Sequence, residues 1–171
     1  MSNRETLFGR LATLGIETTT LEHDPVFTVE ESTVIHQKLA GGHTKNLFLK
    51  DAKGKLFLVV AQSHTKINLK TLHKSIGCAR LSFGKPDLLM DVLGVEPGSV
   101  SAFCIICDDQ KKIEQVIIDD TLMSFDQLNC HPLTNAATTT IERDDLLRFV
   151  RDCGHEPRIM SINDQDTQIA E

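Results

Sequence analysis

A polar cluster directly precedes an apolar run in the first third of the chain. Thr44, Lys45 and Asn46 supply a hydroxyl, an ammonium and an amide in succession. The apolar residues 47–49 that follow predict a buried strand with these three side chains at its entrance. A cation and an amide in that position suit an anionic or carbonyl-bearing ligand better than they suit a core.

Each of these residues also has a simpler interpretation. Lys45 can neutralise a phosphate or a developing oxyanion, or it can be an ordinary surface lysine. Asn46 can hydrogen-bond a ribose or a carbonyl, or it can cap the entrance of the strand. The residue types alone leave both pairs of alternatives open.

Two further polar loops lie beside predicted strands. Residues 98–101 read Gly-Ser-Val-Ser and offer a run of backbone N–H groups that could cradle a carbonyl oxygen, although a plain turn has the same composition. His131 precedes Pro132, which holds it in an extended conformation. This histidine can act as an acid or base, orient a ligand by hydrogen bonding, or serve only the structure.

The common catalytic and nucleotide-binding signatures are missing: there is no GxSxG, P-loop, GxGxxG or HExxH sequence. Cys104 and Cys107 form a CxxC pattern, but we expect it in an apolar strand, where positions three apart point to opposite faces. Five histidines show no ligand-type spacing with one another or with the cysteines: His36, His43, His64, His73 and His155. We therefore expect neither a metal nor a cofactor.

The charge of the chain is unevenly distributed. Its net charge is -6, yet residues 38–85 carry ten basic side chains and one acidic side chain, a local charge of +9 against -15 elsewhere. A basic region on an acidic protein predicts a local phosphate-binding surface, with an accidental bias of a solvated face as the alternative. No segment approaches the ~20 apolar residues of a membrane span, and the N-terminus has no signal-peptide core. We expect a cytoplasmic protein without a membrane partner.

The 171 residues predict one domain over residues 1–160 and a flexible acidic tail over residues 161–171. Helices and strands alternate, yet several strands meet at hairpin-type turns. This pattern favours an α+β fold, a single mixed domain with a curved, largely antiparallel sheet. Helices are predicted over residues 5–14, 28–39, 68–76, 86–93 and 144–153, and strands over residues 17–21, 46–49, 56–61, 79–83, 103–107, 115–118 and 138–141.

Four phrases of the sequence resemble the YbaK/prolyl-tRNA-synthetase-associated editing-domain family, specifically its freestanding, ProX-type aminoacyl-tRNA deacylases. The phrases occur in the order of the family and span most of the chain. They are HDPVFTVEE (23–31), TKNLFLKD (44–51), LGVEPGSVS (93–101) and HPLTNAAT (131–138). The resemblance implies a curved sheet or barrel-like core flanked by helices. It also implies hydrolysis of the ester between a wrong amino acid, typically alanine, and tRNA(Pro).

The resemblance implies roles for particular residues as well. Lys45 would hold the phosphate of the terminal adenosine or position the ester, with Asn46 beside it, and His131 would help to fix the substrate. The mechanism would be substrate-assisted: a ribose hydroxyl helps to activate water, loop N–H groups stabilise the oxyanion, and no side chain is the nucleophile. Further substrate contacts are implied for Phe27, Gly98, Ser99, Val100, Ser101, Ala102 and Asn135. Contacts with phosphates of the tRNA(Pro) acceptor end are implied for Lys50, Lys66, Lys70, Lys74 and Arg80.

The chain departs from the family pattern at one position of the substrate loop. The family loop reads GxxxP, whereas Ala102 stands here in place of the proline. Loss of the proline frees φ and restores an N–H group, so the rim of the pocket could have a different shape. Alanine remains the expected amino acid. The alternatives are a deacylase of another small-residue mischarged tRNA and a non-catalytic tRNA- or nucleotide-binding module, and prolyl-tRNA synthetase is the candidate protein partner.

Overall fold

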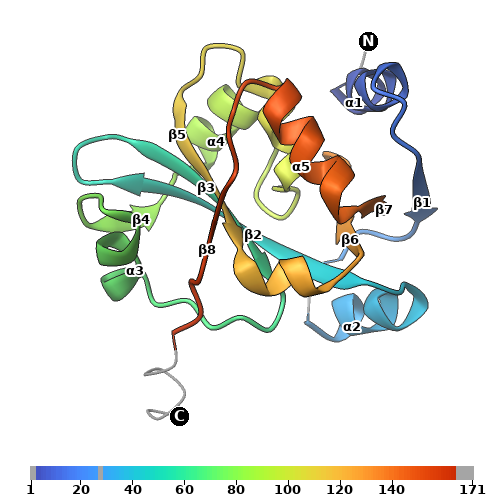
Figure 1. Cartoon of the computed structure of the whole chain (residues 1–171), viewed down its shortest axis with the longest axis horizontal. Helices are drawn as coiled ribbons and strands as arrows, with labels where there is room; N and C mark the ends of the chain where they lie inside the picture. Colours follow the sequence, from blue (N-terminus) through green and yellow to red (C-terminus); the bar gives the residue numbers. More distant parts are fainter. Residues whose placement is uncertain (1–2, 27–28, 165–171) are drawn as a thin grey trace.

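The computed structural model describes residues 3–26 and 29–164 (Figure 1). Within them the chain forms one α+β domain around a mixed, open sheet of eight strands. The helices are α1 (Asn3–Thr13), α2 (Val29–Lys38), α3 (Leu69–Ile76), α4 (Pro86–Leu93) and α5 (Arg143–Asp152), with 3-10 helices η1 (Ala102–Cys107) and η2 (Asp120–Ser124). The strands are β1 (Thr18–Glu22), β2 (Gly42–Asp51), β3 (Leu56–Gln62), β4 (Leu81–Phe83), β5 (Ile113–Asp119), β6 (Gln127–Cys130), β7 (Ala137–Glu142) and β8 (Arg158–Met160).

The sheet combines antiparallel and parallel pairings. Its strands follow one another in the order β1, β7, β6, β2, β3, β5 and β8, and β4 pairs with β2. Strand β7 is antiparallel to β1 and β6, and β2 is antiparallel to β3 and β4. The β2–β6, β3–β5 and β5–β8 pairs are parallel. The predicted α+β class is confirmed, with parallel pairs that the hairpin turns of the sequence did not indicate.

Strand β3 is the centre of the packing. Its apolar run is buried on both faces, because alternate side chains of a strand point in opposite directions. Leu58 and Val60 join a large core with side chains of α1, α4, α5 and η1. Phe57 and Val59 join a smaller core with side chains of α3. In Figure 1, α3 and β4 lie together at one end of the sheet, whereas α4 and α5 lie away from that end.

Helices α3 and α4 confirm the predicted start and stop signals. The Asn68 side chain accepts the N–H of Lys70 at 3.0 Å and caps α3. Gly77 ends that helix in the left-handed region, with φ of 86°. Pro86 begins α4 at the position where a missing N–H costs nothing. Thr28, the predicted cap of the helix before β2, lies outside the described residues.

Residues 103–107 belong to the 3-10 helix η1 and not to the predicted strand. The hydroxyl of Ser101 accepts the N–H of Phe103 at 3.2 Å and caps this helix. A short, uninterrupted apolar run does not by itself distinguish a buried helix from a buried strand. Cys104 and Cys107 therefore lie in a helical turn, and the expected placement on opposite faces of a strand was wrong.

Strands β6 and β8 were absent from the predicted elements. Strand β6 reads Gln-Leu-Asn-Cys and β8 has three residues, so neither is long enough to show a clear alternating pattern. Both are held by pairing with longer neighbours, β7 and β5. Their existence depends on the sheet rather than on local sequence.

The packed structure continues beyond residue 160. Ile162 is buried against the smaller core. The N–H of Lys66 donates to Asn163 Oδ1 at 2.8 Å, and the N–H of Asp164 donates to the Lys66 carbonyl at 2.7 Å. Residues 165–171 lie outside the described part of the chain. Among the helices of the described residues, none is long and apolar enough to span a membrane.

The buried carboxylate of Asp51 fixes the β2–β3 hairpin. It accepts the N–H groups of Lys53 and Lys55 at 2.9 Å each and that of Ala79 at 3.3 Å. Burial would raise the pKa of this carboxyl, but the backbone donors outweigh burial and lower the pKa below its ordinary value.

We expect Asp51→Ala to lower the free energy of unfolding by about 2–3 kcal/mol at pH 7, because three main-chain N–H groups lose their charged acceptor. The lowered pKa makes this contribution present above the unfolded-state pKa of ~3.9 and lost as the pH falls through the folded-state pKa. Urea unfolding at pH 7 and pH 3 measures the effect, with the exposed Asp120→Ala as the control. An equal loss of unfolding free energy at pH 7 and pH 3 would contradict the assignment of this contribution to the ionised Asp51 carboxylate.

Candidate active site

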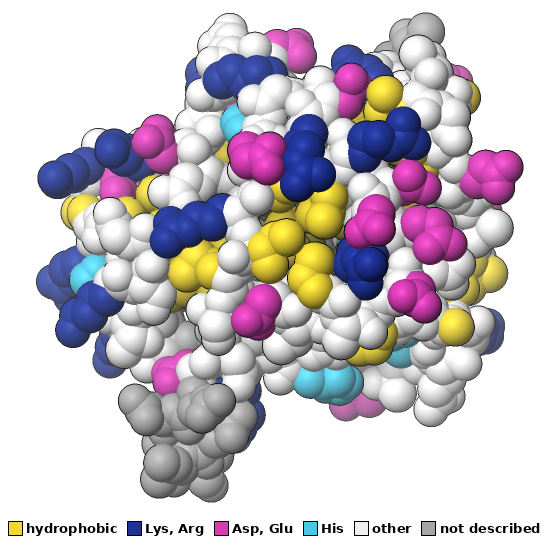
Figure 2. Space-filling model, viewed as in Figure 1, with side chains coloured by type: hydrophobic (Ala, Val, Ile, Leu, Met, Phe, Trp, Pro, Cys, Tyr) yellow, Lys and Arg dark blue, Asp and Glu magenta, His cyan; other side chains and the backbone are white. Residues whose placement is uncertain are grey.

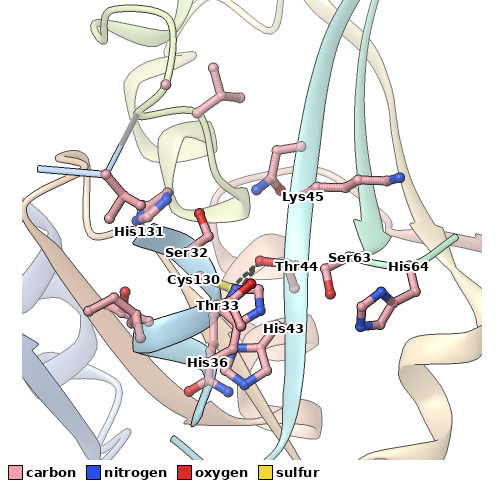
Figure 3. A pocket seen from close by; sticks show the side chains of 17 residues that line it. Ser32, Thr33, His36, His43, Thr44, Lys45, Ser63, His64, Cys130 and His131 are labelled. Carbon is pink, nitrogen blue, oxygen red and sulfur yellow. Dashed lines mark hydrogen bonds between the residues drawn. The ribbon is translucent and has the colours of Figure 1, made fainter. Parts of the chain in front are cut away.

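A cavity of about 520 Å³ opens where β2 changes its strand partner (Figure 3). On one edge β2 pairs with β6 through Gly42 and His43 and with β4 through residues 49–51. Within the described residues, no strand covers residues 44–48 on that edge. Helix α2, the loop before η1 and the β6–β7 connection surround the gap and line the cavity.

The register of β2 determines which main-chain groups face this gap. Ser63, the residue after β3, donates its N–H to the carbonyl of His43 at 2.8 Å. His43 therefore directs its main-chain hydrogen-bonding groups toward β3. Alternate residues of an antiparallel strand direct theirs to opposite edges, which places those of Thr44 and Asn46 on the gap side. Gly84 donates its N–H to the Phe48 carbonyl at 2.9 Å on the same edge, in agreement with this register.

Lys45 brings a cation to the cavity. Its ammonium donates to the carbonyl of Thr65 in the loop after β3. Burial lowers the pKa of Lys45, and the carboxylate of Asp119 acts in the opposite direction. Asp119 is fully buried and accepts the N–H groups of Gln62 and Thr121 at 3.0 Å each, so it fixes the loop that holds Lys45.

His131 has a defined tautomer. Its Nδ1 lies 3.0 Å from the carbonyl oxygen of Ala137. Because a carbonyl only accepts, Nδ1 carries the proton and Nε2 of the neutral ring is an acceptor. Burial lowers the pKa of His131 and favours this neutral form. The main chain is fixed as well, since the Ser101 hydroxyl donates to the His131 carbonyl at 2.6 Å.

Two further histidines form a stacked pair between α2 and β2. The rings of His36 and His43 have centroids 4.0 Å apart and planes inclined by 19°. Burial, followed by the neighbouring His43 ring, lowers the pKa of His36 to about 4. Burial also lowers the pKa of His43, whose Nε2 contacts the Leu39 carbonyl at 3.1 Å. Both rings are therefore neutral at pH 7, while His64 lies exposed at the same cavity.

Two buried polar atoms of the cavity lining have no hydrogen-bond partner among the described residues. They are Asn46 Oδ1 and Ser63 Oγ. Buried polar atoms in native proteins are nearly always paired, because an unpaired one loses the hydrogen bonds it made with water. Both atoms are covered by protein, so neither faces the open space of the cavity in this structure.

Five of the residues that the sequence indicated as a site line this cavity: Lys45, Asn46, Gly98, Val100 and His131. The sequence separates them by up to 86 positions, and the fold brings them together. Asn135 lies next to Gly98, since a Cβ on that glycine would be 3.8 Å from the Asn135 Nδ2. Phe27 lies outside the described residues.

The other residues of the predicted loop, Ser99, Ser101 and Ala102, are not part of the cavity lining. The N–H of Ser99 donates to the Glu96 carbonyl at 3.1 Å, and that of Ser101 to Cys104 Sγ at 3.3 Å. Ala102 is fully buried as the first residue of η1. Two of the loop N–H groups predicted to cradle an oxyanion are thus engaged within the protein itself.

The basic residues predicted to bind RNA are not part of the cavity lining. Four of them are exposed and Lys66 is half-buried; the exposed four are Lys50, Lys70, Lys74 and Arg80. Figure 2 shows basic side chains gathered at the end of the molecule where Figure 1 places α3, β4 and the β2–β3 hairpin.

Sequence reasoning missed the contribution of α2 and of the turn after β3. Ser32, His36, His43, Ser63 and His64 line the cavity, and Figure 3 shows them around it. Spacing gave no signal for the three histidines, because their proximity arises from the packing of α2 on β2. In residues 3–26 and 29–164, no group of three or more His, Cys, Asp or Glu side chains is arranged to hold a metal ion.

Comparison with known proteins identifies the relatives of this chain. The sequence profile of the aminoacyl-tRNA editing domain matches residues 23–149. The prolyl-tRNA editing protein ProX of Acetoanaerobium sticklandii is 38% identical over 156 residues, which cover 91% of this chain and 94% of that protein. Prolyl-tRNA synthetase associated domain-containing protein 1 of Bos taurus is 37% identical over 165 residues, covering 94% and 95%. A crystal structure described as that of a candidate trans-editing enzyme for prolyl tRNA synthetase shares the fold, with a TM-score of 0.72 at 15% identity, covering 96% of this chain and 98% of that one.

We expect the His36 ring to titrate near pH 4 and His43→Ala to move that midpoint toward 6.5, because the variant removes a ring and admits water. With a folded-state pKa below the unfolded value, stability falls as the pH is lowered from ~6.5 to ~4. Proton NMR of the imidazole C–H groups measures the midpoints. His73→Ala, on α3, is the matched control. A His36 midpoint near pH 6.5 in the wild type would show that this ring is not buried, and would contradict the packing of α2 on β2.

Proposed function

The chain belongs to the aminoacyl-tRNA editing domain family, and from this premise we propose that it hydrolyses the ester that joins alanine to mischarged tRNA(Pro). The names of its relatives, which concern editing of prolyl-tRNA and association with its synthetase, support that substrate. The observation that carries the proposal is the gap beside β2, where Lys45, Asn46 and His131 line one cavity.

The charges of the cavity suit the attack of water on an ester. The tetrahedral intermediate carries a negative charge on the former carbonyl oxygen, and a cation or N–H groups fixed nearby stabilise it. Lys45 supplies the cation, and the Asn46 N–H faces the gap from β2. Since the N–H groups of Ser99 and Ser101 are engaged within the loop, these β2 groups carry more of the stabilisation than the sequence indicated.

The nucleophile is water rather than a protein side chain. Cys130 is the thiol in the lining, and burial raises its pKa to about 12, so it is not a thiolate at pH 7. The neutral His131 presents Nε2 as an acceptor for a proton of the substrate ammonium or of the water. A ribose hydroxyl beside the ester would complete the activation of the water, as the substrate-assisted mechanism requires.

The cavity also offers apolar surface for the side chain of a small amino acid. Its lining includes the apolar side chains of Val26, Ile35, Val100 and Cys130. A synthetase pocket built for proline excludes alanine by only ~1–3 kcal/mol, since a smaller apolar group still fits. A second site that admits only small side chains corrects the error.

Ala102 does not require a new loop geometry. It follows the N-cap Ser101 as the first residue of η1, the position at which proline is best tolerated. A proline there would occupy the same place in the helix. Alanine in place of proline at position 102 therefore changes the flexibility of the loop more than its backbone conformation. Mischarged alanine remains the first aminoacyl group expected as substrate.

The basic end of the molecule lies along β2 from the cavity. Lys50 is five residues beyond Lys45 on the same strand, roughly 16 Å at ~3.3 Å per residue. That separation is about five stacked nucleotides at ~3.4 Å each. An RNA whose 3′ end enters the cavity would therefore meet the exposed basic residues with its acceptor stem.

We expect purified protein to release alanine from Ala-tRNA(Pro) and to spare Pro-tRNA(Pro), and Lys45→Ala to lower kcat/KM by about 100-fold or more. Ser-tRNA(Pro) and Ala-tRNA(Ala) complete the substrate panel. Lys112→Ala, an exposed lysine outside the basic region, is the matched control and retains full rate. Full activity of Lys45→Ala would remove Lys45 from the mechanism. Faster loss of another aminoacyl group would identify a different small-residue substrate, and binding without turnover of any of the four would identify a binding module.

Charge reversal on α3 tests the path of the RNA. We expect Lys70→Glu with Lys74→Glu to weaken tRNA binding and to reduce the slope of log Kd against log salt by about two, because two phosphate contacts are lost. Filter binding at several salt concentrations measures the slope, with Lys111→Glu, a lysine outside the basic region, as the control. An unchanged slope would place the RNA on another surface.

A further inference from the structure

The loop directly after β3, residues 63–66, receives the cation of the candidate site, and we call it the lysine loop. The carbonyl of Thr65 in this loop accepts the Lys45 ammonium, and Thr65 is buried. A lysine side chain is a flexible four-carbon stem, so a fixed acceptor at its end determines where the charge lies. The position of the Lys45 charge therefore depends on what holds the lysine loop in place.

The inner side of the lysine loop is held by Asp119. This fully buried carboxylate, at the end of β5, accepts the hydroxyl of Thr65 and the N–H of Gln62. The N–H of Thr65 donates to the Gln62 carbonyl at 2.9 Å and closes the turn. Asp119 thus fixes the start of the loop and the Thr65 side chain, and its hydrogen bonds do not include the main chain of Lys66, the residue that follows.

The outer side of the lysine loop meets the C-terminal segment. Met160 of β8 pairs with Asp119 of β5, so the chain that leaves β8 passes the end of β5 and reaches the segment between β3 and α3 (Figure 1). There Asn163 Oδ1 accepts the N–H of Lys66 at 2.8 Å, and the Lys66 carbonyl accepts the N–H of Asp164 at 2.7 Å. Two consecutive residues of the C-terminal segment therefore bind both main-chain groups of Lys66.

This segment is itself anchored. Ile162, the residue before Asn163, is buried in the smaller core together with side chains of β3 and α3. Asn163 and Asp164 are half-buried and are not part of the cavity lining. The contacts with Lys66 are thus made from outside the cavity, by a segment that is fixed to the same core as β3.

We propose that Asn163 and the main chain of Asp164 position Lys45 for the reaction: they hold the lysine loop against Asp119, so that the Thr65 carbonyl keeps the Lys45 ammonium at the cavity. The inference rests on the proposed function, since it takes the Lys45 charge to stabilise the intermediate of ester hydrolysis. It gives the C-terminal segment a role in the activity. Displacement of a reacting group by about 1 Å can lower a rate by about 100-fold, so a loop held on one side only is expected to cost activity.

Two shortened chains test this role. The first ends at Ile162 and keeps the buried side chain, but lacks both groups that bind Lys66. The second ends at Asp164 and keeps both of them. We expect the first to lower kcat on Ala-tRNA(Pro) by about 10-fold or more, with KM close to the wild-type value, because the cation acts on the transition state more than on the bound ester. The second is the matched control and retains the wild-type kcat.

Point substitutions in the full chain separate the side chain from the chain end. We expect Asn163→Ala to lower kcat several-fold, and Asn163→Asp to restore it, because a carboxylate oxygen also accepts the Lys66 N–H. Ser161→Ala, an exposed position of the same segment, is the control and leaves kcat unchanged. Urea unfolding of each variant under the assay conditions verifies that the fraction of folded protein is the same.

A double-mutant cycle with Lys45 distinguishes positioning from a general loss of structure. We expect Asn163→Ala to leave the residual kcat of Lys45→Ala unchanged, because the cation that it positions is already gone. Equal loss of kcat in the presence and in the absence of Lys45 would show that Asn163 serves stability alone, and would overturn the proposal.

The remaining outcomes separate this inference from the proposed function. Hydrolysis of Ala-tRNA(Pro) at the wild-type rate by the chain that ends at Ile162 and by Asn163→Ala would overturn the positioning role and leave the proposed function standing. Absence of hydrolysis of any mischarged tRNA by the wild-type protein would overturn the proposed function, and the positioning role with it.

Discussion

The structure depends on a single strand, β3, that is buried on both of its faces. Its even-numbered side chains belong to the larger core and its odd-numbered side chains to the smaller one. A shift of the β3 pairing by one residue would turn each side chain toward the other core. This constraint fixes the register of β2, which pairs with β3 over seven residues. With its register fixed, β2 extends past β3 to reach β6 at one end and meets β4 at the other. The gap between these two partners follows from the geometry of the sheet, and it is where the cavity lies.

Groups outside the cavity lining hold the polar side chains of the candidate site in place. Asp119 holds the loop that receives the Lys45 ammonium, and Ser101 ties the start of η1 to the main chain of His131. Each joins segments that are distant in sequence by hydrogen bonds protected from water, where they are expected to be strongest. Among the described residues, the cavity lining thus carries one lysine cation and the neutral imidazoles of His36, His43 and His131. A hydrolytic site that uses orientation and electrostatics rather than a covalent nucleophile requires this kind of rigidity.

Much of the architecture followed from local patterns. The cap at Asn68, the glycine after α3 and the proline at the start of α4 each determine a helix end through their own backbone chemistry. The apolar run of β3 identified a central strand. The same reasoning failed for η1, because an apolar run of five residues fits either a strand or a helix, and only the Ser101 cap and the surrounding core decide between them. It also failed for β6 and β8, whose hydrogen bonds are made with other strands.

For the site, the sequence by itself determined which residue types stand at the start of β2 and after β6, and therefore a cation, an amide and a histidine suited to an ester. It also determined the family, through four phrases in a fixed order. Only the tertiary structure decided that Ser63 and the histidines of α2 and β2 share the cavity, and that Ser99 and Ser101 direct two of their N–H groups inward. The reason is physical: residue type sets what a side chain can do, whereas neighbours, burial and pKa arise from contacts between segments far apart in the chain.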